Sequence, residues 1–408
     1  MGRLYTNMVR AAAGVAGLLA VLHAGALLVA QSNDSLPAPY ASISENGVHY
    51  SGPGRETAYD IPGSTIYIGM LVPTHGPQKA DGDAILLAAR MAIQDASRAA
   101  LPGGRHLALA IADESVPPWG ILGDEIIHLV MQDQVIAIVT SADGVAAHLS
   151  EQIGNKMGVA TLTLSADDTA TEIDMPWIFR IGPSDSQQAQ VMARNIYRVH
   201  GYRHVLLVSA QDHDGRMASE QYIKEARKFG GPAPISLAIN PLQLDTRPLL
   251  ALIAAKAPQA IVFWTLPENA GKLIRAIRAK GFHTPIYLAQ KTAQEGSGFR
   301  FPRLTTGTPK ESGVIDCYTV ESRQIESPSR RSFVRRYEAA TGTLPSLVAA
   351  EAYDGIRLVA QAIYRAGPNR ARVRDAVSAV RNFAGVSGAI TFDNQGNNHT
   401  KVYLVSLE

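Results

Sequence analysis

The chain has 408 residues, of which 46% are hydrophobic and 18% are charged, and its formal net charge is +2. This length and apolar content suffice for about two or three domains with buried cores. The near-neutral charge, without a basic stripe interleaved with aromatic residues, argues against a nucleic-acid partner. The single cysteine, Cys317, excludes an intramolecular disulfide and a cysteine-based zinc cluster.

The first thirty residues are typical of a secretory signal. Arg3 and Arg10 accompany an almost wholly apolar run over residues 11–30, and the small residues Ala24-Gly25-Ala26 offer a cleavage site. We expect residues 1–30 to be a signal peptide, with a retained membrane anchor as the alternative, since about 20 apolar residues can just span a bilayer. Residues 31–64 are rich in Ser, Pro, Gly and Asn and are expected to form a linker.

Strands and helices alternate from residue 65 onward. The run 66–72 is apolar throughout, as expected of a strand buried on both faces of a parallel sheet, and a helix follows it up to Ala96. Further strands are predicted at 106–112, 135–139, 159–164 and 177–180, and further helices at 119–131 and 145–156. This alternation predicts parallel βαβ units.

A second series of the same kind follows the first. Its predicted strands are 204–209, 235–239, 260–265 and 285–289, and its predicted helices are 184–200, 218–229, one capped by Asp245, and 267–280. The remaining part is predicted to form a strand at 313–320, helices at 329–340, 347–366 and 369–382, and strands at 388–393 and 402–406. Two comparable series predict an α/β chain with two doubly wound lobes and a ligand cleft between them.

Motifs for catalysis are missing from the sequence. It contains no Gly-x-Ser-x-Gly elbow, no His-Glu-x-x-His, no Walker A loop and no Gly-x-Gly-x-x-Gly after a strand. The group Asp212-His213-Asp214 could resemble a metal or acid–base cluster, but a solvated loop or polar contacts to a ligand are the simpler interpretations. We therefore expect a protein that is not an enzyme and that holds no metal and no cofactor.

Polar residues recur where the predicted strands end, which is the edge of an open α/β sheet where ligands bind. In the first series the candidates are Thr74, His75, Ser141, Ala142, Asp143, Gly144, Ser165, Ala166 and Asp167. In the second series they are Asp212, Asp214, Thr265, Glu268 and Lys291. Together they predict a site for a small polar molecule.

Five segments, taken in chain order, carry a family resemblance. They are Ile68-Gly69 through Pro73, the strand 135–139, Phe179-Arg180 through Gln188, Glu351-Ala-Tyr353-Asp354, and Gly388 through Asp393. With these segments, residues 65–408 resemble the periplasmic substrate-binding proteins of ABC transporters, in the branched-chain amino acid (leucine/isoleucine/valine-binding) class.

The resemblance implies a type I periplasmic binding protein-like fold, whose two lobes are joined by a three-strand hinge. It places residues 65–184 and 316–384 in lobe I and residues 185–315 and 385–408 in lobe II, with crossings near 182–186, 311–320 and 383–388. It implies a periplasmic monomer that captures a small polar ligand by hinge closure and delivers it to ABC transporter permease subunits. A ligand-sensing module that regulates a membrane or signalling partner is the alternative.

Two residues depart from the family pattern. The resemblance implies a threonine near the ligand carboxylate after the fourth strand, where this chain has Asp167, and an acid for the ligand ammonium, where this chain has Lys291. Each departure would place like charge against a bound amino acid. The sequence therefore predicts a ligand with a different arrangement of charges. The alternative is that Asp167 and Lys291 turn outward or pair with each other and that backbone groups hold an amino acid.

Overall fold

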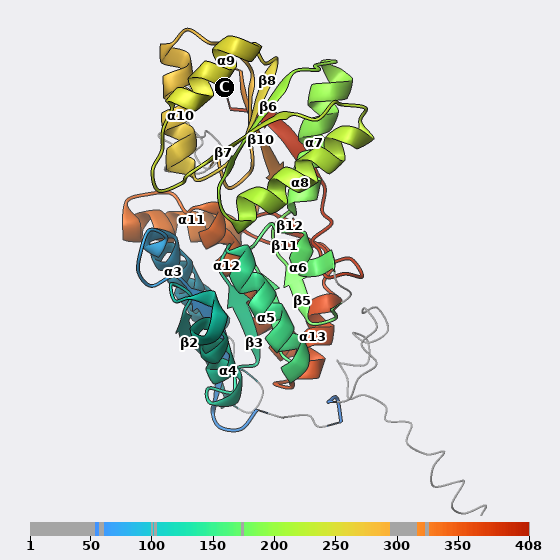
Figure 1. The fold of residues 1–408 in the computed structure, drawn as a ribbon. Coiled ribbons are helices and arrows are strands. Elements are labelled where there is room, and N and C mark those ends of the chain that lie inside the picture. Colours follow the sequence, from blue (N-terminus) through green and yellow to red (C-terminus); the bar gives the residue numbers. More distant parts are fainter. Residues whose placement is uncertain are drawn as a thin grey trace, which may run out of the picture. The chain divides into compact units, whose positions relative to one another are not determined.

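The computed structural model describes residues 54–56, 61–98, 101, 104–172, 175–293, 316–322 and 326–407 (Figure 1). The expected signal peptide or anchor, at residues 1–30, lies outside this part of the chain. Within the described ranges, no helix combines the length and the apolar character that crossing a membrane requires.

The first sheet consists of five parallel strands in the order β2-β1-β3-β4-β5. The strands are β1 (Thr65–Val72), β2 (His106–Asp113), β3 (Ala137–Thr140), β4 (Ala160–Thr163) and β5 (Ile178–Arg180). Every residue of β3, β4 and β5 is buried. Burial on both faces of a parallel sheet is what the short apolar runs predicted.

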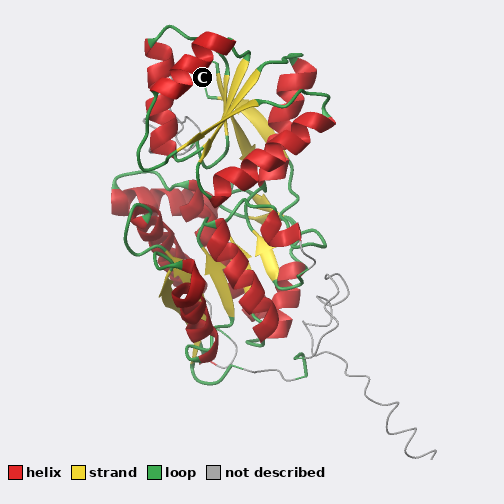
Figure 2. Ribbon diagram, viewed as in Figure 1, coloured by secondary structure: helices red, strands yellow, loops and turns green. Residues whose placement is uncertain are grey.

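Helices cover this sheet on both faces, as the ribbon shows (Figure 2). The helices are α3 (Lys79–Ala96), η2 (Pro118–Leu122), α4 (Gly123–Met131), α5 (Gly144–Met157), α6 (Thr169–Glu172), α11 (Pro328–Thr341), α12 (Leu347–Ala366) and α13 (Arg370–Ser378). One core is formed where α4 and α5 pack on the sheet, with Leu71, Ile126 and Ile138 fully enclosed. The long helices α3 and α12 pack against each other. We call this sheet with its helices the first lobe.

The second sheet has six strands in the order β13-β10-β9-β8-β6-β7, all parallel except β13, which is antiparallel to β10. The strands are β6 (Val205–Ala210), β7 (Ile235–Ile239), β8 (Ala260–Trp264), β9 (Ile286–Leu288), β10 (Cys317–Ser322) and β13 (Val402–Ser406). The helices are α7 (Asp185–Ala193), η3 (Arg194–Val199), α8 (His213–Lys228), α9 (Arg247–Lys256) and α10 (Pro267–Ala279).

This second lobe has a hydrophobic core on each face of its sheet. Tyr222 of α8 and Val262 belong to one core, whereas Phe263 joins Leu249 of α9 and Leu273 of α10 in the other. Neighbouring residues of β8 thus face opposite layers, as the alternation of side chains along a strand requires. Two doubly wound lobes were predicted, and the structure confirms them.

The chain passes between the two lobes three times. The first passage joins β5 to α7, near residues 182–186 as expected. The strand β10, however, pairs with β9 and β13 in the second sheet, although residue 316 was expected to open the second part of lobe I. The passage therefore follows Ser322, and α11 then contacts the first lobe, where Arg336 bonds to Asp95.

The third passage also comes later than expected. The short hairpin of β11 (Phe383–Ala384) and β12 (Ala389–Ile390) precedes it. Asp354 of α12 accepts hydrogen bonds from the backbone N–H groups of Val386 and Ser387, both at 2.8 Å. Asn398 N donates to Arg180 O at 3.2 Å. The segment up to Asn398 is thus held on the first lobe, and only β13 joins the second sheet.

Several helix boundaries differ from the sequence prediction. The helix expected at 218–229 begins at His213, because Asp212 caps it by accepting from Gly215 N. The helix expected from Trp119 begins at Gly123, since Gly120 has a φ of 96°. The last helix ends at Ser378 instead of residue 382. The single-turn helix α6 and the two-residue strand β11 have no periodic pattern long enough to predict.

Candidate functional site

The ends of strands from both lobes meet through three contacts. Gly144 N donates to Asp214 Oδ1 at 3.0 Å, and His213 Nε2 lies 2.7 Å from Asp167 Oδ2. Lys291 Nζ donates to the carbonyl oxygen of Leu164. Each contact joins one residue of the first lobe to one of the second. The structure therefore brings several predicted site residues together from sequence-distant segments.

The loop after β3 supplies four of the candidates. Ser141 is buried, donates to the carboxylate of Glu114 and accepts from Asp143 N at 3.1 Å. Asp143 caps α5 by accepting from Ala146 N at 2.8 Å. Ala142 lies half-buried between them. This hydrogen bonding fixes the start of α5, where the backbone N–H of Gly144 contacts Asp214 of the second lobe.

Gly144 is where the two lobes approach most closely in this loop. A Cβ atom at this position would lie 2.3 Å from Asp214 Oδ1, 3.0 Å from Asp167 Oδ2 and 3.0 Å from His213 Cδ2. The first distance is far below van der Waals contact. A glycine is required for this packing because the hydrogen bond from its N–H brings the Asp214 carboxylate against the backbone.

The loop after β4 is held by hydrogen bonds from its own residues, from β5 and from the start of α7. Ser165 Oγ accepts from Asp167 N at 3.2 Å. The carbonyl oxygen of Ala166 accepts from Arg180 Nη1 at 2.6 Å and from Asp185 N at 2.9 Å. Ser165 and Asp167 are both buried. The backbone carbonyl of Ala166 thus helps to hold the loop in place. The carboxylate of Asp167 points toward the second lobe.

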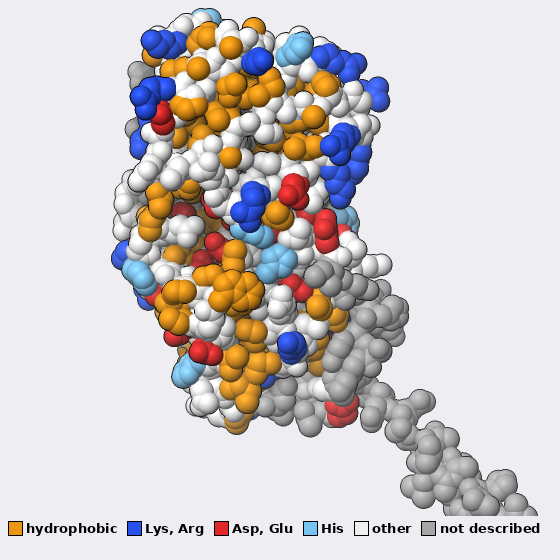
Figure 3. Space-filling model, viewed as in Figure 1, with side chains coloured by type: hydrophobic (Ala, Val, Ile, Leu, Met, Phe, Trp, Pro, Cys, Tyr) orange, Lys and Arg blue, Asp and Glu red, His pale blue; other side chains and the backbone are white. Residues whose placement is uncertain are grey.

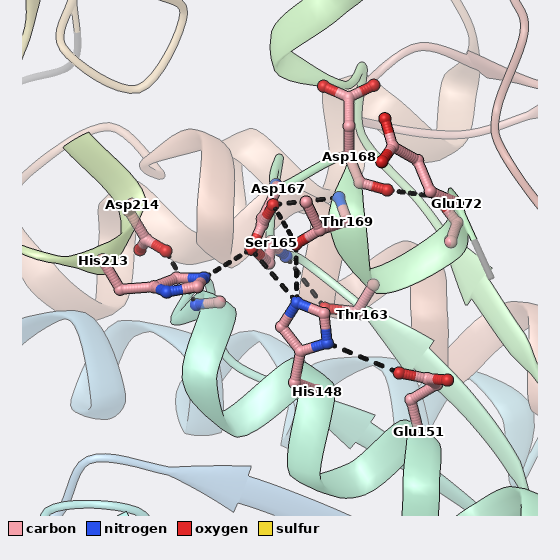
Figure 4. A network of polar contacts seen from close by, with 12 residues as sticks. His148, Glu151, Thr163, Ser165, Asp167, Asp168, Thr169, Glu172, His213 and Asp214 are labelled. Carbon is pink, nitrogen blue, oxygen red and sulfur yellow. Dashed lines mark hydrogen bonds and ion pairs between the residues drawn. The ribbon is translucent and has the colours of Figure 1, made fainter. Parts of the chain in front are cut away.

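Asp167 is the centre of a polar network (Figure 4). Its Oδ1 atom accepts from Thr169 N and Oγ1, at 3.0 and 2.7 Å. Its Oδ2 atom faces His213 Nε2 at 2.7 Å and His148 Nε2 at 3.5 Å. Burial alone would raise the pKa of Asp167, but hydrogen bonds from His148, Thr169 and His213 outweigh it and hold this pKa well below its usual value.

His148 is charged at neutral pH in this setting. Its Nδ1 atom lies 3.5 Å from Glu151 Oε2, one turn further along α5. Hydrogen bonds to Asp167 and Glu151 raise the pKa of His148 to about 9, although burial opposes the shift. The His148 imidazolium thus lies between the carboxylates of Asp167 and Glu151, whose side chains are each only 1% exposed.

The second lobe contributes Asp212 and Asp214 after β6. Asp212 is exposed and caps α8 by accepting from Gly215 N at 2.8 Å. Asp214 faces the first lobe, and burial is the main reason why its pKa is raised well above the usual value. The negative charges of Asp143, Asp185 and Asp212 raise the pKa of Asp214 further. Several aspartate side chains thus lie close together in this part of the site.

Thr265, Glu268 and Lys291 follow β8 and β9. Thr265 N donates to Thr292 Oγ1 at 3.1 Å, and Thr292 Oγ1 donates to Thr265 O at 2.8 Å. The buried hydroxyl of Thr265 has no partner among the described residues. Glu268, in the first turn of α10, is exposed. The pKa of Asp81 in α3 is raised by burial and then by Glu268, and it is lowered by Lys291. Glu268 and Lys291 thus act electrostatically on the first lobe.

Thr74 and His75 make different contacts. Thr74 N donates to Asp113 Oδ1 at 3.1 Å, and His75 Nδ1 lies 2.9 Å from Asp113 Oδ2. The His75 backbone N–H donates to Ser115 Oγ at 3.1 Å, and the His75 side chain is 63% exposed. The structure therefore joins these two candidates to the end of β2, within the first lobe.

Sequence reasoning missed three titratable groups near the predicted residues. Glu114 directly follows β2, and burial raises its pKa well above the usual value. Glu351 of α12 is 1% exposed, and burial raises its pKa to about 7. The third group is His148. The position of Glu114 at a strand end was a usable signal, whereas His148 and Glu351 lie inside helices.

The space-filling view shows histidine and acidic side chains at the level where the two lobes meet (Figure 3). Hydrophobic side chains cover more of the surface above and below this level on the same face. A polar surface rich in acids, with Lys291 and two histidines among them, suits recognition of a small polar molecule more than an apolar one.

Comparison with known proteins relates this fold to a family. A family model described as periplasmic binding protein matches residues 65–408. The leucine-, isoleucine-, valine-, threonine-, and alanine-binding protein of Pseudomonas aeruginosa is 23% identical over 348 residues, which cover 83% of this chain and 89% of that protein. An amino acid binding protein of the same organism is 24% identical and covers 74% of this chain and 79% of its own length.

Solved structures share the fold. The branched-chain amino acid transporter substrate-binding protein LivJ of Streptococcus pneumoniae, in complex with isoleucine, matches with a TM-score of 0.70 and 22% identity over 84% of this chain and 96% of its own. A solute-binding protein of an ABC transporter from R. palustris, in complex with benzoate, matches with a TM-score of 0.69 and 18% identity over 84% and 93%. These matches confirm the resemblance seen in the sequence, and the chain belongs to the periplasmic binding protein family.

Proposed function

We propose that the chain is an extracytoplasmic solute-binding protein that captures a small polar ligand between its lobes by hinge closure and delivers it to an ABC importer. The observation that carries this proposal is the convergence of strand-end loops from both lobes, through Gly144 with Asp214, Asp167 with His213, and Lys291 with Leu164. A ligand that contacts both lobes favours the closed arrangement, because only that arrangement offers all of its contacts.

The ligand-binding residues we propose are those that the sequence singled out at the strand ends. Among them Thr265, whose buried hydroxyl has no partner in the described part of the chain, has hydrogen-bonding capacity left for a ligand. Asp214 and Lys291 offer charges of opposite sign on the second lobe. Thr74 and His75 are the weakest members of the set, since Asp113 and Ser115 already occupy their polar groups.

Branched-chain amino acids are poor ligands for this arrangement. Asp167 uses its two oxygens for Thr169, His148 and His213, so it offers no donor to a ligand carboxylate. Lys291 reaches into the first lobe, where a ligand ammonium would need an acid. Two like charges about 4 Å apart at an effective dielectric near 20 repel by roughly 4 kcal/mol, so the Lys291 contact alone would cancel about half of a micromolar affinity of about 8 kcal/mol.

Isothermal titration with leucine, isoleucine and valine tests this view of the ligand. The wild-type chain should bind all three far more weakly than a micromolar dissociation constant. A variant with both Asp167→Thr and Lys291→Glu removes the two opposing charges and should bind at least one of them more tightly than the wild type does. Micromolar binding of any of the three by the wild type would refute the proposed ligand class.

The site of action that we propose is the periplasm, reached by a signal that is removed after residue 26 to 30. The family's name and the apolar N-terminal segment support this assignment. We further propose that the chain is a monomer, works by binding alone and docks on ABC transporter permease subunits. The intact mass of the exported chain tests the cleavage, and recovery of a membrane-bound chain that begins near Met1 would contradict it.

A further inference from the structure

His148, Asp167 and His213 bring three metal-ligating atoms to one point between the lobes. The two imidazole Nε2 atoms and Asp167 Oδ2 all lie within 4.8 Å of one another. His148 and Asp167 belong to the first lobe, and His213 is the first residue of α8 in the second. Both rings point toward the Asp167 carboxylate (Figure 4), and their planes are nearly perpendicular, at 89°.

We propose that these three side chains bind one divalent transition-metal ion of the zinc type, shared between the lobes. Zinc in proteins is bound at about 2.0–2.2 Å by imidazole nitrogens and carboxylate oxygens, so neighbouring ligand atoms around a tetrahedral ion lie about 3.3 Å apart. The separations from Asp167 Oδ2 are 2.7 Å to His213 and 3.5 Å to His148. The distance between Asp167 and His148 is thus close to that value, and the distance between Asp167 and His213 must widen when the ion binds.

The atoms behind the ligands support a metal site independently. A metal-bound histidine usually donates its other ring N–H to a carboxylate, which fixes the ring's orientation. Glu151 Oε2 lies 3.5 Å from His148 Nδ1, opposite the Nε2 atom that faces Asp167. Glu151 is 1% exposed, and the contact with His148 Nδ1 is the ion pair that its carboxylate makes among the described residues. A buried carboxylate in this position is explained by a role as partner to a metal-binding histidine.

Asp167 is held so that a single oxygen remains for the ion. Its Oδ1 atom accepts from both the backbone N–H and the hydroxyl of Thr169. Its Oδ2 atom is left facing the two histidines. When the ion binds, the protons on His213 Nε2 and His148 Nε2 are released to solvent, and His148 Nε2 exchanges its 2.6 Å contact with Thr169 Oγ1 for the metal. Two histidines and one carboxylate, with water as fourth ligand, form a familiar zinc coordination set.

The sequence led us to expect no metal, because Asp212-His213-Asp214 was considered alone. His148 lies in α5 and Asp167 in the loop after β4, so no short motif joins the three ligands. The metal proposal does not depend on the organic ligand. It can be tested with the metal alone, and its failure would leave the proposed solute binding intact.

The test uses the full chain without an added histidine tag, stripped with a chelator and then titrated with Zn²⁺ against a chromogenic chelator. We expect one ion per chain. The substitutions His148→Ala and His213→Ala should each weaken binding more than Glu151→Gln, which should weaken it about 10–100-fold. His128→Ala is the matched control, because this exposed histidine also faces an acid, Asp133 at 4.0 Å. It should bind like the wild type.

Bound Co²⁺ provides a second readout that does not depend on affinity. A tetrahedral site with nitrogen and oxygen ligands should give visible d–d absorption in the wild type and in His128→Ala, and should lose it in His213→Ala. Thermal unfolding of the metal-free variants checks that each remains folded. Absence of Zn²⁺ binding by the wild type would overturn the proposal, as would undiminished binding by folded His148→Ala or His213→Ala protein.

Discussion

At Gly144 the absence of a side chain allows the first lobe to receive the Asp214 carboxylate. The backbone N–H of Gly144 donates to Asp214 Oδ1 at 3.0 Å, whereas a Cβ atom would lie only 2.3 Å from that oxygen. Gly123, at the start of α4, has no such neighbour, since a Cβ atom there would meet Leu149 Cδ2 at 3.9 Å. Both glycines therefore lie at the start of a helix, but only Gly144 has a side chain of the second lobe packed against it.

We expect Gly144→Ala to leave both lobes folded and to weaken their contact. Alanine is at least as favourable as glycine in a helix, so the fold of the first lobe gains or loses little. The added methyl group, by contrast, displaces the Asp214 carboxylate and removes its hydrogen bond from Gly144 N, which is one of the contacts that hold the lobes together. Solution scattering should show a larger radius of gyration for Gly144→Ala than for the wild type, with Gly123→Ala unchanged. Identical radii for all three proteins would contradict this expectation.

Glu351 is a buried acid that stays protonated over part of the physiological pH range. Its pKa is raised to about 7, mainly by burial; Lys291 opposes this rise and Asp354 adds to it. Because the folded pKa lies above the unfolded value, the folded state binds more protons between about pH 4.5 and 7. The contribution of Glu351 to stability is therefore fully present below about pH 4.5 and is lost as the pH rises through about 7.

The substitution Glu351→Gln should remove this pH dependence. We expect the variant to gain free energy of unfolding relative to the wild type at pH 8, by at most about 3 kcal/mol, and to show a smaller difference at pH 5. Asp185 and Asp354, whose pKa values burial raises to about 7 and about 6, remain in both proteins and cancel in the comparison. Urea unfolding at the two pH values provides the measurement. A variant that is less stable at pH 8 would indicate a charged Glu351 paired with Lys291.

The residues of the site were only partly predictable. Asp143, Asp167, Asp212 and Asp214 follow strands, and that position identified them. The partners that set their electrostatics could not be identified in the same way, because His148 and Glu151 lie on α5, at positions that look like an ordinary amphipathic helix. Which helical residues face a neighbouring lobe depends on the packing of whole elements, and this packing is not visible in a local pattern.

Among the elements, the three-residue strand β5 carries Arg180, which connects several other segments of the first lobe. Arg180 is fully buried and donates to the carbonyl of Ala166, to Thr171 Oγ1 and to Asn397 Oδ1, at 2.6, 2.5 and 3.3 Å. Its backbone N–H also donates to Gly396 O at 2.8 Å. One side chain thus ties the loop after β4, the helix α6 and the segment before β13 to the end of the first sheet.

Replacing this guanidinium should cost much of the protein's stability. We expect Arg180→Met to lower the free energy of unfolding by about 3 kcal/mol or more, since buried acceptors and the nearby buried Asp185 would lose their partner. Arg247→Met is the control, because Arg247 also bonds to an acid, Asp245, but its side chain is 89% exposed. Chemical denaturation of both variants measures the difference. A similar small loss in both would show that burial does not matter here.

The order of the strands and helices could be read from the sequence, because long apolar runs and helical periodicity depend on local residues. The assignment of β10 to a lobe could not. Its apolar run suits a buried strand in either sheet, and only its pairing with β9 and β13 decides between them. The same holds for the segment before β13, whose place is set by hydrogen bonds to Asp354 and with the backbone of Arg180, both far away in the sequence.

For the whole molecule, membership of the periplasmic binding protein family and the convergence of both lobes support one account of how the protein acts. Solved structures with this fold hold ligands as different as isoleucine and benzoate. We propose that the strand-end residues select the ligand and that Asp167 and Lys291 set the arrangement of charge in this chain. A ligand identified by mass spectrometry of the purified protein would supply the molecule for the decisive measurement.

That measurement is solution scattering with and without this ligand, combined with thermal or chemical unfolding. If the ligand is captured between the lobes, the radius of gyration should fall on binding. At a hundredfold excess over the dissociation constant, the free energy of unfolding should rise by about 2.7 kcal/mol. Clear stabilisation without any change in the radius of gyration would show that the ligand binds to one lobe alone, and would contradict capture by closure.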